Sequence, residues 1–375
     1  MGALFQNYAR RPIAIEKGQG TEVFDTNGKR YLDFTSGIAV CSLGHAHPAI
    51  VKAIQAQSEK LWHISNLFES PGQEKLAETL VKDLHLSHAF FCNSGAEANE
   101  AAIKLARKHT GKHKIIVFQQ SFHGRTFGAM SATGQDKVRN GFGPLVSEFV
   151  TLPFNDVAAL KSAVDDKTAA IMLELIQGEG GVNPVTDEFA AAIHDIHQNS
   201  DVLLIVDEVQ TGIGRTGTRF AFEQTVLKPD IVSMAKGLGG GFPIGGILGT
   251  AELFDTFSAG THGTTFGGNP LGVAVAQTVV DHVFNEEFLT GVQQKSAYLV
   301  AKVKEVLPHV NVYGKGLMLG IGWGEDVASY VTALDKAGLL TVAAGPQVIR
   351  LLPPLTVSNE EIDEAVAILK SVLVK

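Results

Sequence analysis

The sequence predicts an α/β fold, with a large domain built on a mostly parallel central sheet and a smaller α+β domain after it. Three observations predict it. Helical and strand patterns alternate through the middle of the chain, glycine-rich polar segments follow the strands, and the pattern changes near residue 275. With 375 residues, of which 45% are hydrophobic, the chain is long enough to bury a large core and a second, smaller one.

The central strands are expected where short apolar runs are bounded by turn residues. These runs lie at residues 89–92, 115–118, 170–175, 203–206, 231–234 and 246–249. Helical patterns separate most of them, which is typical of crossover units that set strands side by side in parallel. We therefore expect residues 46–275 to form one large α/β domain.

The two ends of the chain have different patterns. Residues 21–34 alternate apolar and polar side chains around a Thr-Asn-Gly-Lys turn, which predicts a hairpin outside the central sheet. Helical patterns flank candidate strands at 317–323 and 348–352, as in a small α+β domain. We expect residues 276–375 to form that domain and the N-terminal segment 1–45 to pack with it.

Composition disfavours several classes of partner. The net charge of −8 leaves no basic surface for nucleic acid or for anionic membranes. Neither a signal-peptide pattern nor an apolar run of about 20 residues is present, so we expect a cytoplasmic protein.

Metal and disulfide chemistry are not expected either. Cys41 and Cys92 lack CxxC spacing, so they predict neither a disulfide framework nor a zinc site. The histidine pairs at 45 and 47 and at 194 and 197 have no third ligand at matching spacing.

Lys236 and Asp207 are the strongest candidates for chemistry. Each follows an apolar strand pattern, so both side chains are expected at the carboxyl edge of the sheet, where open α/β sheets bind ligands. A lysine amine and a carboxylate held together there suit pyridoxal phosphate. Its aldehyde forms a Schiff base with an amine, and its ring nitrogen stays protonated beside a carboxylate.

A phosphate seat is expected where Asn-Ser-Gly-Ala-Glu-Ala-Asn (residues 93–99) opens an alanine-rich helix. Ser94 and Glu97 have capping-box spacing, and Gly95 and Ala96 begin the first turn. Free N–H groups and the positive end of the helix dipole favour a phosphate at such a terminus. Taken alone, the same segment is an ordinary capped helix.

Two further segments follow strand patterns at the same edge. Phe122 is suited to stack on a flat ring, and Arg125 to hold a carboxylate through its planar fork. Glu179, in Gln-Gly-Glu-Gly-Gly, places an acid in a turn near the same rim. Either segment by itself is also compatible with a surface turn.

A competing interpretation comes from residues 212–217, which spell Gly-x-Gly-x-x-Gly after a strand, as in nicotinamide-dependent oxidoreductases. The match is weak because polar and charged residues separate the first glycine from the strand. The residues that follow the glycines also lack the helical pattern expected of a crossover helix.

Taken together, these motifs resemble the class III pyridoxal-phosphate aminotransferases over nearly the whole chain. The resemblance runs through Gly-His-Ala-His-Pro, Asn-Ser-Gly-Ala-Glu-Ala-Asn-Glu, Phe-His-Gly-Arg-Thr, Gln-Gly-Glu-Gly-Gly, Asp-Glu-Val-Gln-Thr-Gly, Ala-Lys-Gly-Leu-Gly-Gly-Gly-Phe-Pro-Ile-Gly and His-Gly-Thr-Thr-Phe-Gly-Gly-Asn-Pro. It implies the fold-type-I architecture and a homodimer with shared active sites.

The resemblance also implies a role for each site residue. Lys236 holds the cofactor covalently, Asp207 pairs with the ring nitrogen, and Gln210 reaches the ring hydroxyl. The other cofactor contacts that it implies are Ser94, Gly95, Ala96, Phe122, Val209 and, from the neighbouring subunit, Thr265. The substrate contacts are Arg125, Glu179, Arg350 and, from the partner chain, Thr264.

Within the family, the chain is most similar to members that act on N-acetylornithine. The resemblance implies transfer of its δ-amino group to 2-oxoglutarate, giving N-acetylglutamate 5-semialdehyde and glutamate, with Glu179 neutralising Arg350 in one half of the reaction. Ile38 stands where the ornithine-specific branch has tyrosine, which favours an acylated donor. Ornithine, succinylornithine and 4-aminobutyrate remain alternative donors.

Overall fold

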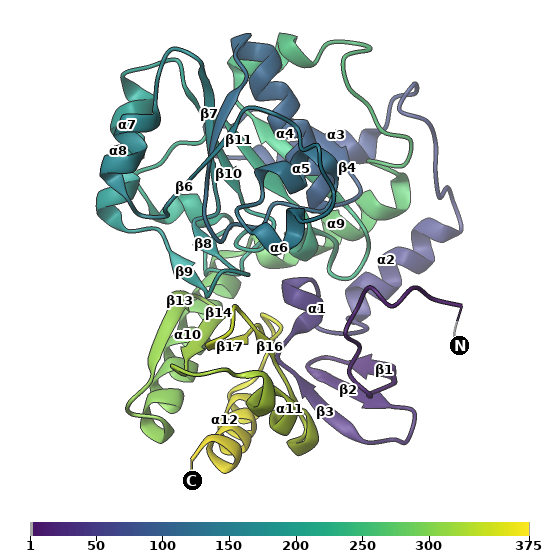
Figure 1. Ribbon diagram of the computed structural model, residues 1–375. Helices are drawn as coiled ribbons and strands as arrows, with labels where there is room; N and C mark the ends of the chain where they lie inside the picture. Colours follow the sequence, from purple (N-terminus) through teal and green to yellow (C-terminus); the bar gives the residue numbers. More distant parts are fainter. Residues whose placement is uncertain (1–2, 375) are drawn as a thin grey trace.

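The computed structural model describes residues 3–374, and within them the strands form four sheets. The central sheet has seven strands in the order β4-β12-β11-β10-β7-β5-β6 (Figure 1). Their bounds are β4 His88–Cys92, β5 Lys114–Phe118, β6 Phe149–Leu152, β7 Thr168–Leu173, β10 Leu203–Asp207, β11 Ile231–Met234 and β12 Gly245–Gly249. β12 runs antiparallel to both β11 and β4, and β11, β10, β7, β5 and β6 pair in parallel. The predicted mostly parallel α/β sheet is therefore confirmed.

Two details of the sheet differ from the prediction. β6 was not predicted, because Phe149–Leu152 is a half-buried edge strand without a long apolar run. The strand predicted at 170–175 is β7, which ends at Leu173. Glu174 therefore lies beyond the strand, at the carboxyl edge of the sheet.

Successive residues of the central strands face opposite sides of the sheet, as the pleat requires. In β5, Ile115 and Val117 pack in the core cluster that includes the buried face of α4 (Gly95–Thr110). Ile116 and Phe118 pack in the larger cluster, which includes side chains of α8 (Asp187–Gln198). Helices thus cover both faces, and the carboxyl edge of the sheet is left for the loops.

The remaining strands form three smaller sheets outside the central one. They are β1 Ile15–Gln19, β2 Glu22–Asp25, β3 Arg30–Asp33 and β15 Leu339–Leu340 in one sheet; β13 Asn311–Lys315, β14 Met318–Gly322, β17 Val348–Leu351 and β16 Val342–Ala343 in another; and the pair β8 Ile176–Gln177 and β9 Asn183–Pro184. The predicted hairpin is β2 and β3, which pair antiparallel.

The other helices of the described residues are short or surround these sheets. They are α1 Ser36–Ala39, α2 Pro48–Ser58, α3 Pro71–Val81, α5 Phe127–Ala132, α6 Asp136–Arg139, α7 Val157–Ala163, α9 Pro270–Val283, α10 Glu286–Val306, α11 Ala328–Ala337, α12 Asn359–Leu373 and the 3₁₀ turns η1 Ala221–Gln224, η2 Lys236–Gly239 and η3 Ala251–Phe257. In the part of the chain that the structure describes, none of the helices combines the length and apolar character needed to cross a membrane.

The N-terminal hairpin lies beside the C-terminal part of the chain. β3 pairs in parallel with β15, and Figure 1 shows β1–β3 near α11 and α12, below the central sheet. The division into residues 1–45, 46–275 and 276–375 stays a prediction. α9 runs through residue 275, so one helix joins the last two parts.

Candidate active site

A cavity of about 400 Å³ opens at the carboxyl edge of the central sheet. Its lining comes from segments that follow β4, β5, β7, β10 and β11, as expected for an open α/β sheet. Nine of the predicted site residues line it, namely Ser94, Gly95, Ala96, Phe122, Arg125, Asp207, Val209, Gln210 and Lys236. Segments more than 100 residues apart in the sequence thus meet in one place.

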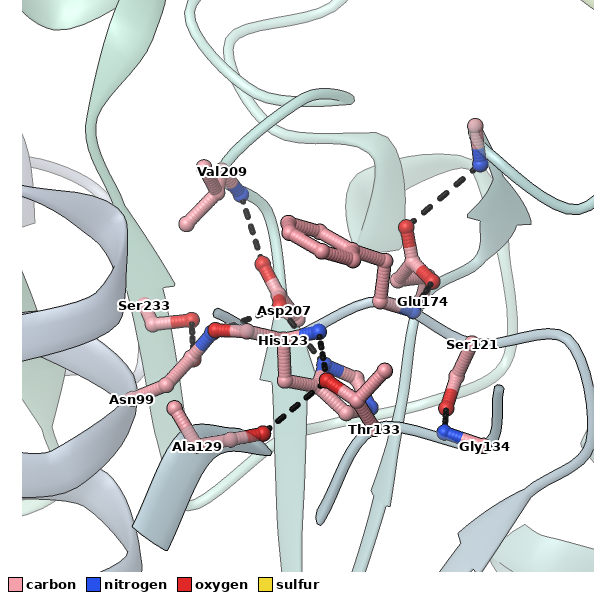
Figure 2. A network of polar contacts seen from close by, with 12 residues as sticks. Asn99, Ser121, His123, Ala129, Thr133, Gly134, Glu174, Asp207, Val209 and Ser233 are labelled. Atoms are coloured by element: carbon pink, nitrogen blue, oxygen red, sulfur yellow. Dashed lines mark hydrogen bonds and ion pairs between the residues drawn. The ribbon is translucent and has the colours of Figure 1, made fainter. Parts of the chain in front are cut away.

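Asp207, the last residue of β10, lies at the centre of a buried polar network (Figure 2). Its Oδ1 accepts the Val209 amide at 3.0 Å. Its Oδ2 accepts the Asn99 side-chain amide at 2.8 Å and lies 2.7 Å from His123 Nδ1. The side chain of Asp207 is 3% exposed, so these contacts hold the carboxylate in one orientation at the cavity wall.

Asn99, His123 and Ser233 received no role from the sequence, although they hold Asp207 in place. Asn99 donates to the His123 carbonyl at 2.7 Å, and its Oδ1 accepts Ser233 Oγ at 2.6 Å. Burial alone would lower the pKa of His123, but the hydrogen bond and charge of Asp207 outweigh it and raise that pKa. The sequence did offer one sign of such a role: Asn99 is a polar residue on the otherwise apolar, alanine-rich face of a helix, where a buried amide needs hydrogen-bond partners.

Lys236 follows β11 and begins η2, with a left-handed φ of 41°. Such a backbone is rare for a side chain of this size and is found mostly at functional sites. Burial lowers the pKa of its amine, and the charge of Arg350 lowers it further, against the opposing effect of nearby carboxylates. The arrangement favours a neutral amine, which can act as a nucleophile or accept a proton.

The N-terminus of α4 forms one side of the cavity. Ser94 caps the helix by accepting the Glu97 amide at 3.2 Å, and the Glu97 carboxylate returns to the Asn93 amide at 2.8 Å. The amides of Gly95 and Ala96 open the helix and have no intrahelical acceptor. The predicted phosphate seat therefore has the donors that it needs.

Close packing explains the glycine in this seat. A Cβ on Gly95 would lie 2.7 Å from Val209 Cγ1, closer than side-chain carbons approach. The backbone of α4 therefore passes directly against Val209, which itself lines the cavity. Phe122 also lines it, and the Arg125 guanidinium lies 5.5 Å from the centre of the Phe122 ring.

Arg350, in β17, meets Glu179 and Gln210 beside the cavity. Its Nη1 donates to Glu179 Oε1 at 2.8 Å, to Gln210 Oε1 at 3.0 Å and to the Gly178 carbonyl at 2.6 Å. Burial would raise the pKa of Glu179, but the charge and hydrogen bond of Arg350 lower it. The ion pair joins a strand of the C-terminal sheet to the turn after β8.

Thr264 and Thr265 lie outside the cavity of their own chain. Thr264 Oγ1 accepts the Asn93 side-chain amide at 3.2 Å, so it contacts the rim, and Thr265 is exposed. Their predicted contribution to a neighbouring subunit stays a prediction.

The glycines at 212, 214 and 217 have packing roles. A Cβ on Gly214 or Gly217 would meet side chains of α9 and α10, and the intervening Arg215 is buried. Arg215 donates to the carbonyls of Leu317 and Pro353. Side chains and backbone therefore fill the space that a dinucleotide would need.

The donor set fits pyridoxal phosphate. The free amides of α4 match the phosphate, the anchored carboxylate of Asp207 matches a protonated ring nitrogen, and the buried amine of Lys236 matches the aldehyde. Phe122 and Val209 supply apolar surface for the faces of a flat ring.

Comparison with known proteins agrees with this fit. A model of the family described as "Aminotransferase class-III" matches residues 5–373. The acetylornithine aminotransferase of Bacillus cereus is 54% identical over 374 residues, which is 99% of this chain and 97% of that protein. The acetylornithine aminotransferase of Halalkalibacterium halodurans is 55% identical over 377 residues, 100% of this chain and 98% of that protein.

Solved structures of similar proteins have the same fold. N-acetylornithine aminotransferase from Stenotrophomonas maltophilia is 39% identical, with a TM-score of 0.84 and coverage of 98% of this chain and 96% of that chain. Ornithine aminotransferase from Toxoplasma gondii is 32% identical, with a TM-score of 0.93 and coverage of 99% and 92%. Because the family match and relatives more than 50% identical extend over almost the whole chain, the protein belongs to the class III aminotransferases, enzymes that depend on pyridoxal phosphate.

Proposed function

We propose that the chain transfers the δ-amino group of N2-acetyl-L-ornithine to 2-oxoglutarate, giving N-acetyl-L-glutamate 5-semialdehyde and L-glutamate, a step of arginine biosynthesis. The names of the full-length relatives support this donor. The structural observation that carries the proposal is the Arg350–Glu179 ion pair beside the cavity, at 2.8 Å. The same site has to accept a donor without a carboxylate next to the reacting carbon and a keto acid that has one there.

The cofactor is proposed to lie between Phe122 and Val209. Ser94 and the amides of Gly95 and Ala96 would hold its phosphate, Asp207 would pair with the ring nitrogen, and Gln210 would reach the ring hydroxyl. When bound, pyridoxal phosphate supplies an aldehyde that takes up the amino group and a cationic ring that stabilises negative charge on the adjoining carbon.

Lys236 would hold the cofactor through its amine and, once that amine is free, would move the proton. Its lowered pKa leaves an amine able to take a proton from the donor's amine-bearing carbon and to return it at the neighbouring position. The hydrogen bond from Asn99 and the contact with His123 hold the Asp207 carboxylate in one orientation, in which it would face the ring.

Arg350 and Glu179 are proposed to act as an exchangeable pair. With the acylated donor, Glu179 stays on Arg350, because the carbon beside the reacting amine carries no charge. With 2-oxoglutarate or glutamate, the α-carboxylate takes the place of Glu179, which moves aside. Separating a buried arginine from its anionic partner is costly unless another anion replaces it, so the exchange selects for a substrate that supplies one. Arg125, exposed at the rim, is proposed to hold the remote carboxylate.

We also propose a homodimer in which Thr264 lines the donor site and Thr265 reaches the phosphate of the partner subunit. Apolar side chains that are at least 60% exposed gather near these threonines, namely Trp62, Leu67, Phe68 and Phe266. Asn66 joins the two segments by donating to the Gly267 carbonyl at 2.9 Å. We also propose a cytoplasmic location, which rests on the sequence alone.

Subunit complementation tests the sharing of sites. Lys236→Ala and Thr265→Ala chains are each expected to be impaired alone. A mixed dimer regains one site with both residues intact, so activity should rise on mixing. No gain in verified mixed dimers would contradict shared sites.

Donor profiling tests the proposed reaction. Cofactor-loaded protein is mixed with N-acetylornithine without acceptor, and the aldehyde released per site is quantified. 2-Oxoglutarate is then added and glutamate is measured. We expect one aldehyde and then one glutamate per site, with N-acetylornithine faster than ornithine, succinylornithine or 4-aminobutyrate. Faster release from one of the other donors would keep the reaction and change the assigned substrate.

A further inference from the structure

Glu174 is a buried acid at the cavity that the assignments above leave without a role. It follows the last residue of β7, lines the cavity and is 5% exposed. A carboxyl group in such a place loses hydration and needs compensating donors. The donors that contact Glu174 therefore indicate its role.

The carboxylate of Glu174 holds two backbone segments, one in the cavity wall and one at the Arg350–Glu179 pair (Figure 2). Its Oε2 accepts the Phe122 amide at 3.0 Å, and its Oε1 accepts the Gly178 amide through a longer contact of 3.4 Å. Phe122 supplies one wall of the cavity, and Gly178 directly precedes Glu179.

The peptide of Gly178 is also tied to the ion pair. Its carbonyl accepts Arg350 Nη1 at 2.6 Å, which is the same nitrogen that contacts Glu179. A Cβ on Gly178 would collide with Gln210 Oε1, so this backbone passes directly against the third member of the cluster. Glu174 and Arg350 thus hold the residue before Glu179 from its N-terminal and C-terminal sides.

We propose that Glu174 is a positioning residue for the amino transfer, whose carboxylate fixes the spacing between the Phe122 wall and the Arg350–Glu179 pair. This inference rests on the proposed function of that pair. Without the carboxylate, the Gly178 peptide loses its partner on one side, and the exchange of Glu179 for a substrate carboxylate becomes less well defined.

The charge state of Glu174 controls this bridge. Burial raises its pKa to about 7, against the opposing charge of His123. The other charged groups that act on it are Asp207, which raises the pKa, and Lys236, which lowers it. The ionised carboxylate accepts at both oxygens, whereas the protonated acid gives up one acceptor, so the bridge weakens as the pH falls through about 7.

The test compares Glu174→Gln with Glu208→Gln in the cofactor-loaded enzyme. Glu208 is a matched control because it is 1% exposed, accepts Thr211 Oγ1 and the Phe222 amide, and has a pKa raised by burial to about 7. It is not among the residues that line the cavity in the described chain. Both half-reactions are measured by single turnover across the neutral pH range, with the donor that the wild type uses best.

Glu174→Gln is expected to raise the half-saturating concentration of glutamate by about three- to tenfold, as for loss of one ordinary intramolecular hydrogen bond. The donor half-reaction should change less, because there Glu179 stays on Arg350. The wild type should lose efficiency in the glutamate half as the pH falls through about 7, and the variant should show no such limb.

Glu208→Gln is expected to keep wild-type half-reactions and the wild-type pH limb. The proposal is overturned if the two variants behave alike, or if Glu174→Gln slows both half-reactions equally and keeps the pH limb. These outcomes are independent of donor identity, because a different preferred donor in the wild type would change only the proposed function.

Discussion

Arg350 and Glu179 form an ion pair of 2.8 Å in which the arginine side chain is 1% exposed and the glutamate side chain 30%. The two partners therefore differ in freedom: Arg350 is fixed in β17, whereas Glu179 lies in a turn at the rim. Separating them leaves a buried cation unless another anion replaces the glutamate. In the exchange that we propose, this asymmetry favours movement of Glu179 rather than of Arg350.

Glu179→Gln is expected to affect the two half-reactions unequally. The donor half should slow by roughly tenfold or more, because the buried arginine loses its only carboxylate partner among the described contacts. The glutamate half should change little, since the substrate brings its own carboxylate. Single-turnover rates for each half measure the effect, and equal losses in both would contradict the role of Glu179.

Lys236→Ala is expected to reduce amino transfer by roughly 1000-fold, the scale of a lost general base. The residual activity should rise when a small primary amine is added, because the cavity gains space where the side chain was. Lys228→Ala, at an exposed position, provides the control and should keep wild-type activity. Wild-type turnover in Lys236→Ala would remove this lysine from the mechanism.

Gly95→Ala is expected to weaken cofactor binding by about tenfold or more, because the new Cβ would lie 2.7 Å from Val209 Cγ1 and displace the phosphate seat. Equilibrium titration with pyridoxal phosphate measures the change. Gly291→Ala, in α10, is the matched control, since a Cβ there meets no atom within 4 Å. Equal affinities in the two variants would show that Gly95 is not needed for close packing.

The sequence predicted those site residues that directly follow a recognisable strand pattern. Asp207 and Lys236 follow β10 and β11, and both lie at the cavity as expected. Glu174 has the same signal, but the predicted strand ran to residue 175 and so included it as an ordinary strand residue. The end of β7 at Leu173 is what turns Glu174 into a cavity residue.

Contacts between distant segments could not be read from spacing. Arg350 and Glu179 are 171 positions apart, and their pairing was expected only from the family resemblance. His123 was part of a recognised motif, yet its contact with Asp207 joins residues 84 positions apart and depends on the strand order of the sheet. Strand order, set by packing of the whole domain, is the information that local patterns lack.

Glu208→Gln is expected to change how stability depends on pH while leaving the fold intact. Burial raises the pKa of Glu208 from 4.5 to about 7, with the charge of Asp207 adding to the shift. Between these values the native state keeps a proton that the unfolded chain releases. The free energy of unfolding contributed by this group therefore falls as the pH rises from 4.5 to about 7 and is constant above it.

A neutral glutamine has no proton to lose, so this part of the pH dependence should disappear. From about pH 5 to about pH 8, the variant should lose on the order of 2 kcal/mol less stability than the wild type. Urea unfolding at one fixed protein concentration measures the difference. Glu305→Gln, at a side chain that is 71% exposed, should run parallel to the wild type. If the stability of Glu208→Gln also ran parallel to that of the wild type across this pH range, Glu208 would be ionised in the native state at no cost. The Thr211 hydroxyl and the Phe222 amide would then compensate its burial in full.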